Sequence, residues 1–206
     1  IFKSIQGEST YTGLPCIFIR LTYCNLRCTY CDTEYAFHEG NDITIDQILN
    51  KVKSFGGNLV EVTGGEPMLQ ENTIPLMKEL LINNYDVLLE TSGAISLKDV
   101  PKEVKKIVDF KCPSSAMEDK NLWDIIDQLN KKDEIKFVIG NIEDYNWVKA
   151  KIIKYNLDEK WTVLLSPVFN KISVDTLAEW ILEDNLNVRF QLQIHKYIWD
   201  PDRRAV

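Results

Sequence analysis

Three cysteines lie close together in the segment YCNLRCTYCDT, where Cys24, Cys28 and Cys31 have the spacing C-x3-C-x2-C. Thiolates bind zinc and iron–sulfur clusters strongly, and a structural zinc site normally has four protein ligands. Cys16 lies inside an apolar stretch, which favours a position in the core. The motif therefore favours a cubane cluster with three irons bound to protein and one open coordination position. A zinc site completed by Cys112 or by a histidine is the alternative.

A second motif, TGGEP at residues 63–67, follows the apolar stretch 58–62. Glycines allow the backbone to approach a ligand closely, and Glu66 can accept hydrogen bonds from an ammonium group. Pro67 restricts the turn. Taken alone, the motif is also compatible with an ordinary turn at the end of a strand.

Short β-rich stretches alternate with amphipathic helical patterns along the chain. The predicted strands are 16–23, 58–62, 85–90, 105–110, 134–140, 161–166 and 187–194. The predicted helices begin near Ile45, Thr73, Leu122, Glu143 and Val174. Thr44 and Gln47 form a capping-box pattern before the first helix, and Gly56 is placed to end it.

This alternation predicts an α/β fold with a parallel sheet and crossover helices. Seven strands in 206 residues are too few for a closed eightfold barrel, so we expect an incomplete, TIM-like barrel in one domain, 1–206. A flat, doubly wound sheet is the alternative. In both folds the carboxyl ends of the strands carry the active site. The cysteine segment, TGGEP, TSG (91–93) and KCPSS (111–115) each follow a predicted strand.

Charge and composition exclude several classes of protein. The net charge of −7, from 24 basic and 31 acidic residues, argues against general binding of nucleic acid. No stretch approaches the roughly 18 apolar residues of a membrane helix, and the N-terminal residues lack a signal-peptide pattern. The cysteines number five, and three of them are crowded together, which predicts a reducing, cytoplasmic environment rather than a disulfide framework.

The cysteine motif, with Tyr30 in its last gap and GGEP downstream, resembles the radical S-adenosylmethionine (SAM) superfamily. The resemblance implies a [4Fe–4S] cluster bound by Cys24, Cys28 and Cys31. It also implies that the amino and carboxylate groups of SAM chelate the fourth iron. Reductive cleavage of SAM would then give a 5′-deoxyadenosyl radical that abstracts hydrogen from the substrate.

Four further segments resemble one family within this superfamily, the 7-carboxy-7-deazaguanine synthases of queuosine and deazapurine biosynthesis. These segments are FKSIQGEST (2–10), CDT (31–33), DFKCPSS (109–115) and QLQIHKYIWDP (191–201), of which SIQGE and CDT are the more specific. The resemblance implies a carbon–nitrogen lyase that converts 6-carboxy-5,6,7,8-tetrahydropterin to 7-carboxy-7-deazaguanine by ring contraction with loss of ammonia. It also implies Mg²⁺, a flavodoxin or ferredoxin as electron donor, and a homodimer.

The resemblance assigns site residues in three groups. The residues expected to contact SAM are Tyr30, Gly64, Gly65, Glu66, Ser92, Cys112, Pro113, Ser114 and Ser166. The residues expected to contact substrate are Ile5, Gln6, Gly7, Glu8, Arg20, Thr63, His195 and Val206. The hydroxyl of Thr33 is the expected protein ligand of Mg²⁺, an ion that keeps several waters and needs few protein oxygens.

The residue types suit these partners. The amide of Gln6 and the carboxylate of Glu8 offer donors and acceptors to the aminopyrimidinone edge of a pterin. Arg20 can bind a carboxylate through two parallel hydrogen bonds. The chain departs from the family at Cys112, where a serine is common, so a side-chain role there is weakened.

Two other functions remain open at this point. An activating enzyme for a glycyl-radical protein would share the cysteine spacing but act on a protein glycine. A zinc-stabilised binding module would use the cysteines for structure alone.

Overall fold

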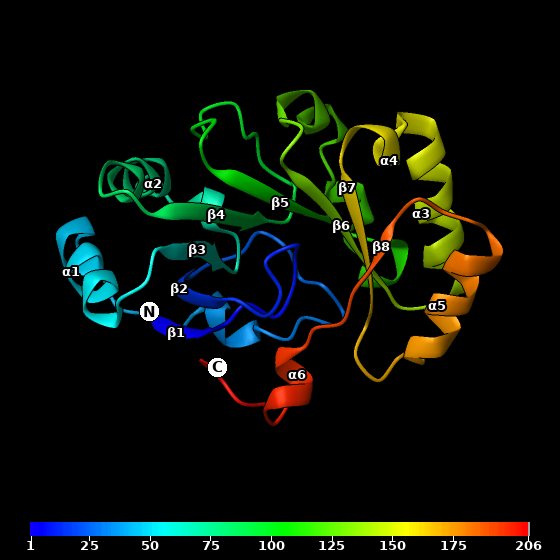
Figure 1. Cartoon of the computed structure of the whole chain (residues 1–206), viewed down its shortest axis with the longest axis horizontal. Helices are drawn as coiled ribbons and strands as arrows, with labels where there is room; N and C mark the ends of the chain where they lie inside the picture. Colours follow the sequence, from blue (N-terminus) through cyan, green and yellow to red (C-terminus); the bar gives the residue numbers. More distant parts are fainter. Residues whose placement is uncertain (206) are drawn as a thin grey trace.

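One eight-stranded sheet forms the centre of the computed structural model, which describes residues 1–205 (Figure 1). The strands are β1 (Phe2–Ile5), β2 (Pro15–Leu21), β3 (Leu59–Gly64), β4 (Asp86–Thr91), β5 (Lys105–Phe110), β6 (Glu134–Ile139), β7 (Thr162–Pro167) and β8 (Arg189–Phe190). Strand β1 pairs with β2 in the antiparallel sense, and every later pair is parallel.

The strand order decides between the two predicted architectures. A doubly wound sheet reverses its strand order at a switch point. Here the spatial order is β1 to β8, the same as the order along the chain, with no reversal. Figure 1 shows α1, α2, α3 and α5 around the outside of the curved sheet. The incomplete barrel is therefore confirmed, and the flat alternative is wrong.

Helices connect most of the parallel strands. They are α1 (Ile45–Phe55), α2 (Thr73–Ile82), α3 (Ile142–Tyr155), α4 (Leu157–Lys160), α5 (Val174–Glu183) and α6 (His195–Ile198). Short 3₁₀ helices are η1 (Glu34–Phe37), η2 (Pro67–Leu69), η3 (Pro113–Ser115), η4 (Glu118–Lys120) and η5 (Trp123–Gln128). Within residues 1–205, no helix has the length and apolar character needed to cross a membrane.

The first helix begins and ends where the sequence predicts. Thr44 Oγ1 accepts a hydrogen bond from Gln47 N at 3.3 Å, and Gln47 Oε1 accepts one from Thr44 N at 2.8 Å. This reciprocal pair satisfies two N–H groups that have no partner inside the helix. Gly56 follows the last residue with a φ of 63°, a conformation that glycine adopts without steric cost.

Alternation along the strands separates a core from a polar interior. Val62 and Leu89 belong to the apolar core, while their neighbours Thr63 and Glu90 border a cavity. The same alternation continues on β5 and β6. Because neighbouring residues of a strand point to opposite faces, the strands can pack on helices outside and present charged groups inside.

Three elements differ from the prediction. Strand β1 was not expected; Phe2 pairs with Phe18 and stacks on its ring at 5.1 Å, a contact between distant parts of the chain. The strand expected at 187–194 is only β8, which has β7 as a neighbour on one side. The helix expected at Leu122 is instead the 3₁₀ helix η5. Both of its ends bond to the loop after β4: Leu122 N donates to Gly93 O at 3.0 Å, and Gln128 Oε1 accepts from Leu97 N at 2.7 Å.

Candidate active site

A cavity of about 740 Å³ lies within the curve of the sheet, bordered by the loops that follow the strands. It brings together residues that are far apart in the sequence. The expected site residues that border it are Ile5, Gln6, Gly7, Glu8, Arg20, Cys24, Cys28, Tyr30, Cys31, Thr33, Thr63, Gly64, Gly65, Ser92 and His195. Glu66, Cys112, Pro113, Ser114 and Ser166 do not border it. Val206 lies outside the described residues.

The cysteine segment is held as a defined loop after β2. Cys24, Cys28 and Cys31 are free thiols that are partly exposed to the cavity. The Arg27 guanidinium donates to the carbonyl oxygens of Cys24 at 2.8 Å and Leu26 at 2.6 Å, and it stacks over a phenylalanine ring of η1. Three accessible thiols on one loop are the donor set that an iron–sulfur cluster uses.

The loop also docks on the segment after β5. Thr29 N donates to Ser115 O at 3.1 Å, and Thr29 Oγ1 donates to Ser114 O at 2.7 Å. In the part of the chain that the structure describes, no group of three His, Cys, Asp or Glu side chains is close enough to hold a single metal ion.

The glycines of TGGEP are required by packing inside the protein. A Cβ atom at Gly64 would overlap Leu21 O, and one at Gly65 would overlap Tyr23 O. Gly65 N donates to Leu21 O at 3.1 Å, so the motif packs directly against the backbone at the start of the cysteine loop. The two glycines therefore fix the distance between the end of β3 and the cluster loop.

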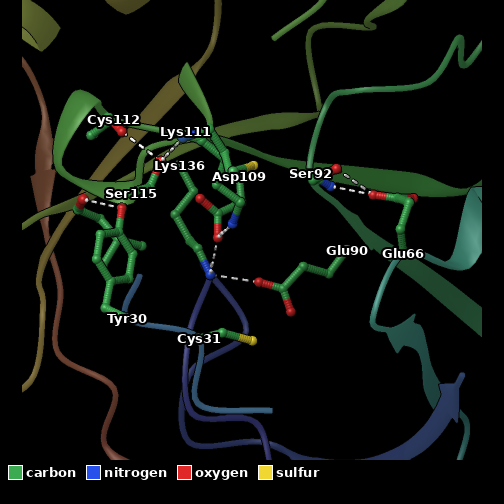
Figure 2. A network of polar contacts seen from close by, with 12 residues as sticks. Tyr30, Cys31, Glu66, Glu90, Ser92, Asp109, Lys111, Cys112, Ser115 and Lys136 are labelled. Atoms are coloured by element: carbon green, nitrogen blue, oxygen red, sulfur yellow. Dashed lines mark hydrogen bonds and ion pairs between the residues drawn. The ribbon is translucent and has the colours of Figure 1, made fainter. Parts of the chain in front are cut away.

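Glu66 makes a set of hydrogen bonds inside the protein. Its side chain is fully buried, and its carboxylate accepts hydrogen bonds from Met68 N at 3.0 Å, Thr91 Oγ1 at 2.8 Å, Ser92 N at 2.8 Å and Ser92 Oγ at 2.6 Å. A carboxylate has about four acceptor positions, and these bonds use them. Glu66 thus positions the Ser92 loop (Figure 2), and its expected contact with the SAM ammonium group stays a prediction.

The segment after β5 also differs in part. The thiol of Cys112 is fully buried in the core, so it does not face the cavity. The Ser114 amide N–H donates to Asp144 Oδ1 at 2.8 Å, and its hydroxyl also bonds Asp144. The Ser166 hydroxyl is buried and has no hydrogen-bond partner within residues 1–205. The roles expected for these residues toward SAM stay predictions.

Polar side chains from the N-terminal segment and β3 orient one another at the cavity. The Gln6 amide donates to Glu61, while Gln6 Oε1 accepts from Glu8 N at 3.0 Å. Burial and the nearby carboxylates of Glu90 and Glu8 raise the pKa of Glu61 well above its ordinary value, which favours its protonated form. The Gln6 side chain is therefore held in one orientation by the protein itself.

Arg20 and His195 also border the cavity. Arg20 Nη1 donates to Gly64 O at 3.3 Å, while its Nε is buried and unpartnered among residues 1–205. The His195 ring packs on Gly7, where an added Cβ would overlap it. Burial lowers the pKa of His195, which keeps the imidazole neutral near pH 7.

Comparisons with known proteins agree with this arrangement. Residues 18–144 match the family model of the radical SAM superfamily. The 7-carboxy-7-deazaguanine synthase of Koribacter versatilis is 45% identical, over 100% of this chain and 98% of that protein. The enzyme of the same name from Chlorobaculum tepidum is 44% identical, over 100% of this chain and 95% of that protein.

The chain belongs to the radical SAM superfamily and to its 7-carboxy-7-deazaguanine synthase family. The crystal structure of QueE from Escherichia coli has the same fold, with a TM-score of 0.76 and 23% identity over 93% of this chain and 90% of that one. Membership of the superfamily implies an enzyme with a [4Fe–4S] cluster and SAM. The three accessible thiols bordering one large cavity fit both groups.

Several charged residues of the radical SAM cavity were missed by the sequence analysis. They are Glu61, Glu90, Asp109, Lys111 and Lys136. Each lies in or directly after an apolar strand, at a position where a charged side chain has no place in a core. A charge in such a stretch was the available signal, because buried charges need partners or a polar cavity.

Proposed function

We propose that this chain converts 6-carboxy-5,6,7,8-tetrahydropterin to 7-carboxy-7-deazaguanine by a radical ring contraction with loss of ammonia. The observation that carries the proposal is similarity along the whole chain to proteins of the 7-carboxy-7-deazaguanine synthase family. When bound, the cluster and SAM would supply the 5′-deoxyadenosyl radical that starts the reaction. The glycyl-radical and zinc-module alternatives have no comparable support.

Several residues that border the cavity suit a carboxylated pterin. The unpartnered Nε of Arg20 is a donor suited to the substrate carboxylate. Gln6, Glu8 and Thr63 border the same region and offer acceptors and donors to the aminopyrimidinone edge. A neutral His195 can donate or accept a hydrogen bond without adding charge. Ile5 and Gly7 would provide contact surface for the ring.

Thr33 is the proposed protein ligand of Mg²⁺. Its hydroxyl makes no cap hydrogen bond to η1, the helix that follows it, so its lone pairs remain available. The hydroxyl lies 3.8 Å from Cys31 Sγ and borders the cavity. One hydroxyl together with waters and a substrate carboxylate would satisfy the oxygen preference of Mg²⁺.

The remaining features of the proposal rest on the resemblance to the family. We propose that residues 1–206 work as one domain, in a homodimer, in the cytoplasm. The electron donor would be a flavodoxin or a ferredoxin. SAM would contact Tyr30, Gly64, Gly65 and Ser92, which border the cavity near the cysteine loop.

The test uses protein with an anaerobically reconstituted cluster. It is incubated with SAM, a reductant and 6-carboxy-5,6,7,8-tetrahydropterin, and the products are identified by mass spectrometry. We expect 7-carboxy-7-deazaguanine, in amounts that depend on SAM and on Mg²⁺. If a protein with a full cluster cleaves SAM but forms no deazapurine, the proposed substrate is wrong.

A further inference from the structure

Lys136 lies at the centre of a charged cluster inside the barrel. It projects from β6 into the cavity, and only 3% of its side chain is exposed. Its Nζ lies 2.6 Å from Glu8 Oε2, 2.5 Å from Glu90 Oε1 and 3.4 Å from Asp109 Oδ2. Figure 2 shows the link to Glu90 across the cavity. One ammonium group thus joins the N-terminal segment, β4, β5 and β6.

The charge of this ammonium is held by its surroundings. Burial disfavours the charged form, but the carboxylates of Glu8, Glu90 and Asp109 raise the pKa of Lys136 well above its ordinary value. Burial alone would raise the pKa of Glu8, yet Lys136 holds it below its ordinary value. An ammonium has three N–H donors, and those of Lys136 make hydrogen bonds to Glu8 and Glu90, with Asp109 as a further ion-pair partner at 3.4 Å. The ammonium group is therefore surrounded by carboxylates of the protein itself.

Its partners, in contrast, keep free acceptor positions. Glu90 accepts from Lys136 and from Thr63 Oγ1 at 3.4 Å. Glu8 accepts from Lys136, from Gln193 Nε2 at 2.8 Å and from Gln191 Nε2 at 3.5 Å. A carboxylate has about four acceptor positions, so each has room to accept from a ligand. Both side chains border the cavity. Lys136 fixes where these acceptors lie.

We propose that Lys136 is a positioning residue, which holds the carboxylates of Glu8 and Glu90 where they accept hydrogen bonds from the amino and ring N–H groups of the substrate. The inference rests on the proposed function, because it takes a pterin as the substrate. It adds a residue that does not touch the substrate but sets the geometry of two groups that do. Without the ammonium, the two carboxylates would repel each other and leave these positions.

A second buried lysine in the same sheet provides a matched control. Lys106 on β5 is 1% exposed and pairs with Asp133 at 2.9 Å. Its side chain does not border the cavity, because residue 106 points to the opposite face of β5 from Asp109. Removing either ammonium leaves a buried carboxylate without its partner. Only the loss of Lys136 should also change the substrate site.

The experiment compares wild type, Lys136→Met, Lys136→Arg and Lys106→Met, each with a reconstituted cluster. Three quantities are measured: iron content, SAM cleavage by reductant without substrate, and kcat/KM for 6-carboxy-5,6,7,8-tetrahydropterin. For Lys136→Met we expect unchanged iron and substrate-free SAM cleavage, with kcat/KM lowered about 100-fold, as for misplacement by about 1 Å. Lys136→Arg should recover part of this loss because it restores the charge.

Lys106→Met should lower the melting temperature but keep kcat/KM within about threefold of wild type, because distant sites act independently. If Lys136→Met does not fold, Lys136→Gln replaces it in the experiment. We expect the same loss of kcat/KM for Lys136→Gln, because this side chain keeps N–H donors but lacks the charge. The inference would be overturned if folded Lys136→Met or Lys136→Gln had the kcat/KM of wild type. It would also be overturned if Lys106→Met lost as much kcat/KM as Lys136→Met. An inactive wild type with a full cluster would instead refute the proposed function, and the inference with it.

Discussion

Replacing Glu66 by Gln tests the role that the structure assigns to TGGEP. Each carboxylate oxygen of Glu66 accepts one backbone N–H and one hydroxyl: Met68 N with Thr91 Oγ1, and Ser92 N with Ser92 Oγ. A hydroxyl can turn and become an acceptor, whereas a backbone N–H cannot. Whichever side the new NH₂ group occupies, one backbone N–H faces another donor.

The magnitude follows from this count. A buried donor that loses its partner costs about 1–3 kcal/mol. For a domain of this size, 1 kcal/mol corresponds to about 2–4 °C in melting temperature. A loss near the middle of that range therefore predicts a melting temperature about 4–8 °C below wild type for Glu66→Gln.

Circular dichroism under anaerobic conditions, with identically prepared proteins, measures the difference. Glu71→Gln is the matched control, because Glu71 is exposed on the same loop and its substitution should change stability by less than about 0.5 kcal/mol. If Glu66→Gln melts together with this control, the four hydrogen bonds do not hold the Ser92 loop as described. A rise in KM for SAM should accompany the loss of stability, because Ser92 borders the cavity.

Three further changes test other parts of the site. Thr33→Ala should remove most of the stimulation by Mg²⁺ while cluster absorbance stays unchanged; loss of iron would make Thr33 structural instead. The melting temperature of Glu61→Gln should rise relative to that of wild type as pH increases from about 5. Burial and the Glu90 carboxylate raise the pKa of Glu61 in the folded protein, so wild type loses stability as its unfolded state releases that proton. A difference in melting temperature that does not change with pH would contradict this. Gly7→Ala should raise the KM for substrate, because the new Cβ displaces the His195 ring; unchanged KM would show that the ring is not a substrate contact.

The motifs and the architecture could be predicted because their signals are local. The spacing of Cys24, Cys28 and Cys31 is a property of one loop, and β-rich stretches alternating with helical patterns predict a parallel sheet directly. The capping box at Thr44 needs only four consecutive residues. The cluster loop, TGGEP and TSG could also be placed at one edge, because parallel strands end together.

Pairings between distant segments could not be predicted in this way. Strand β1 depends on Phe2 meeting Phe18, and the C-terminal segment depends on Ile194 N reaching Gly7 O at 3.1 Å. Neither contact has a signal in its own stretch of sequence. The length of β8 also depends on a distant segment. This strand lies at the edge of the sheet and pairs only with β7, so fewer of its residues are held in the strand than the sequence pattern predicts.

By itself, the sequence determined the resemblance to the family and the α/β class with its parallel sheet, because residue types, spacing and hydrophobic period carry this information. The tertiary structure decided which polar groups remain free for ligands. Glu66 was expected from its type to bind a ligand, and the fold buries it and gives its carboxylate four internal hydrogen bonds. In the sequence, Lys136 is a single charged residue in an apolar strand. In the folded barrel, Glu8, Glu90 and Asp109 surround it. The physical reason is that hydrogen bonding and ionisation depend on neighbours in space, which the fold supplies.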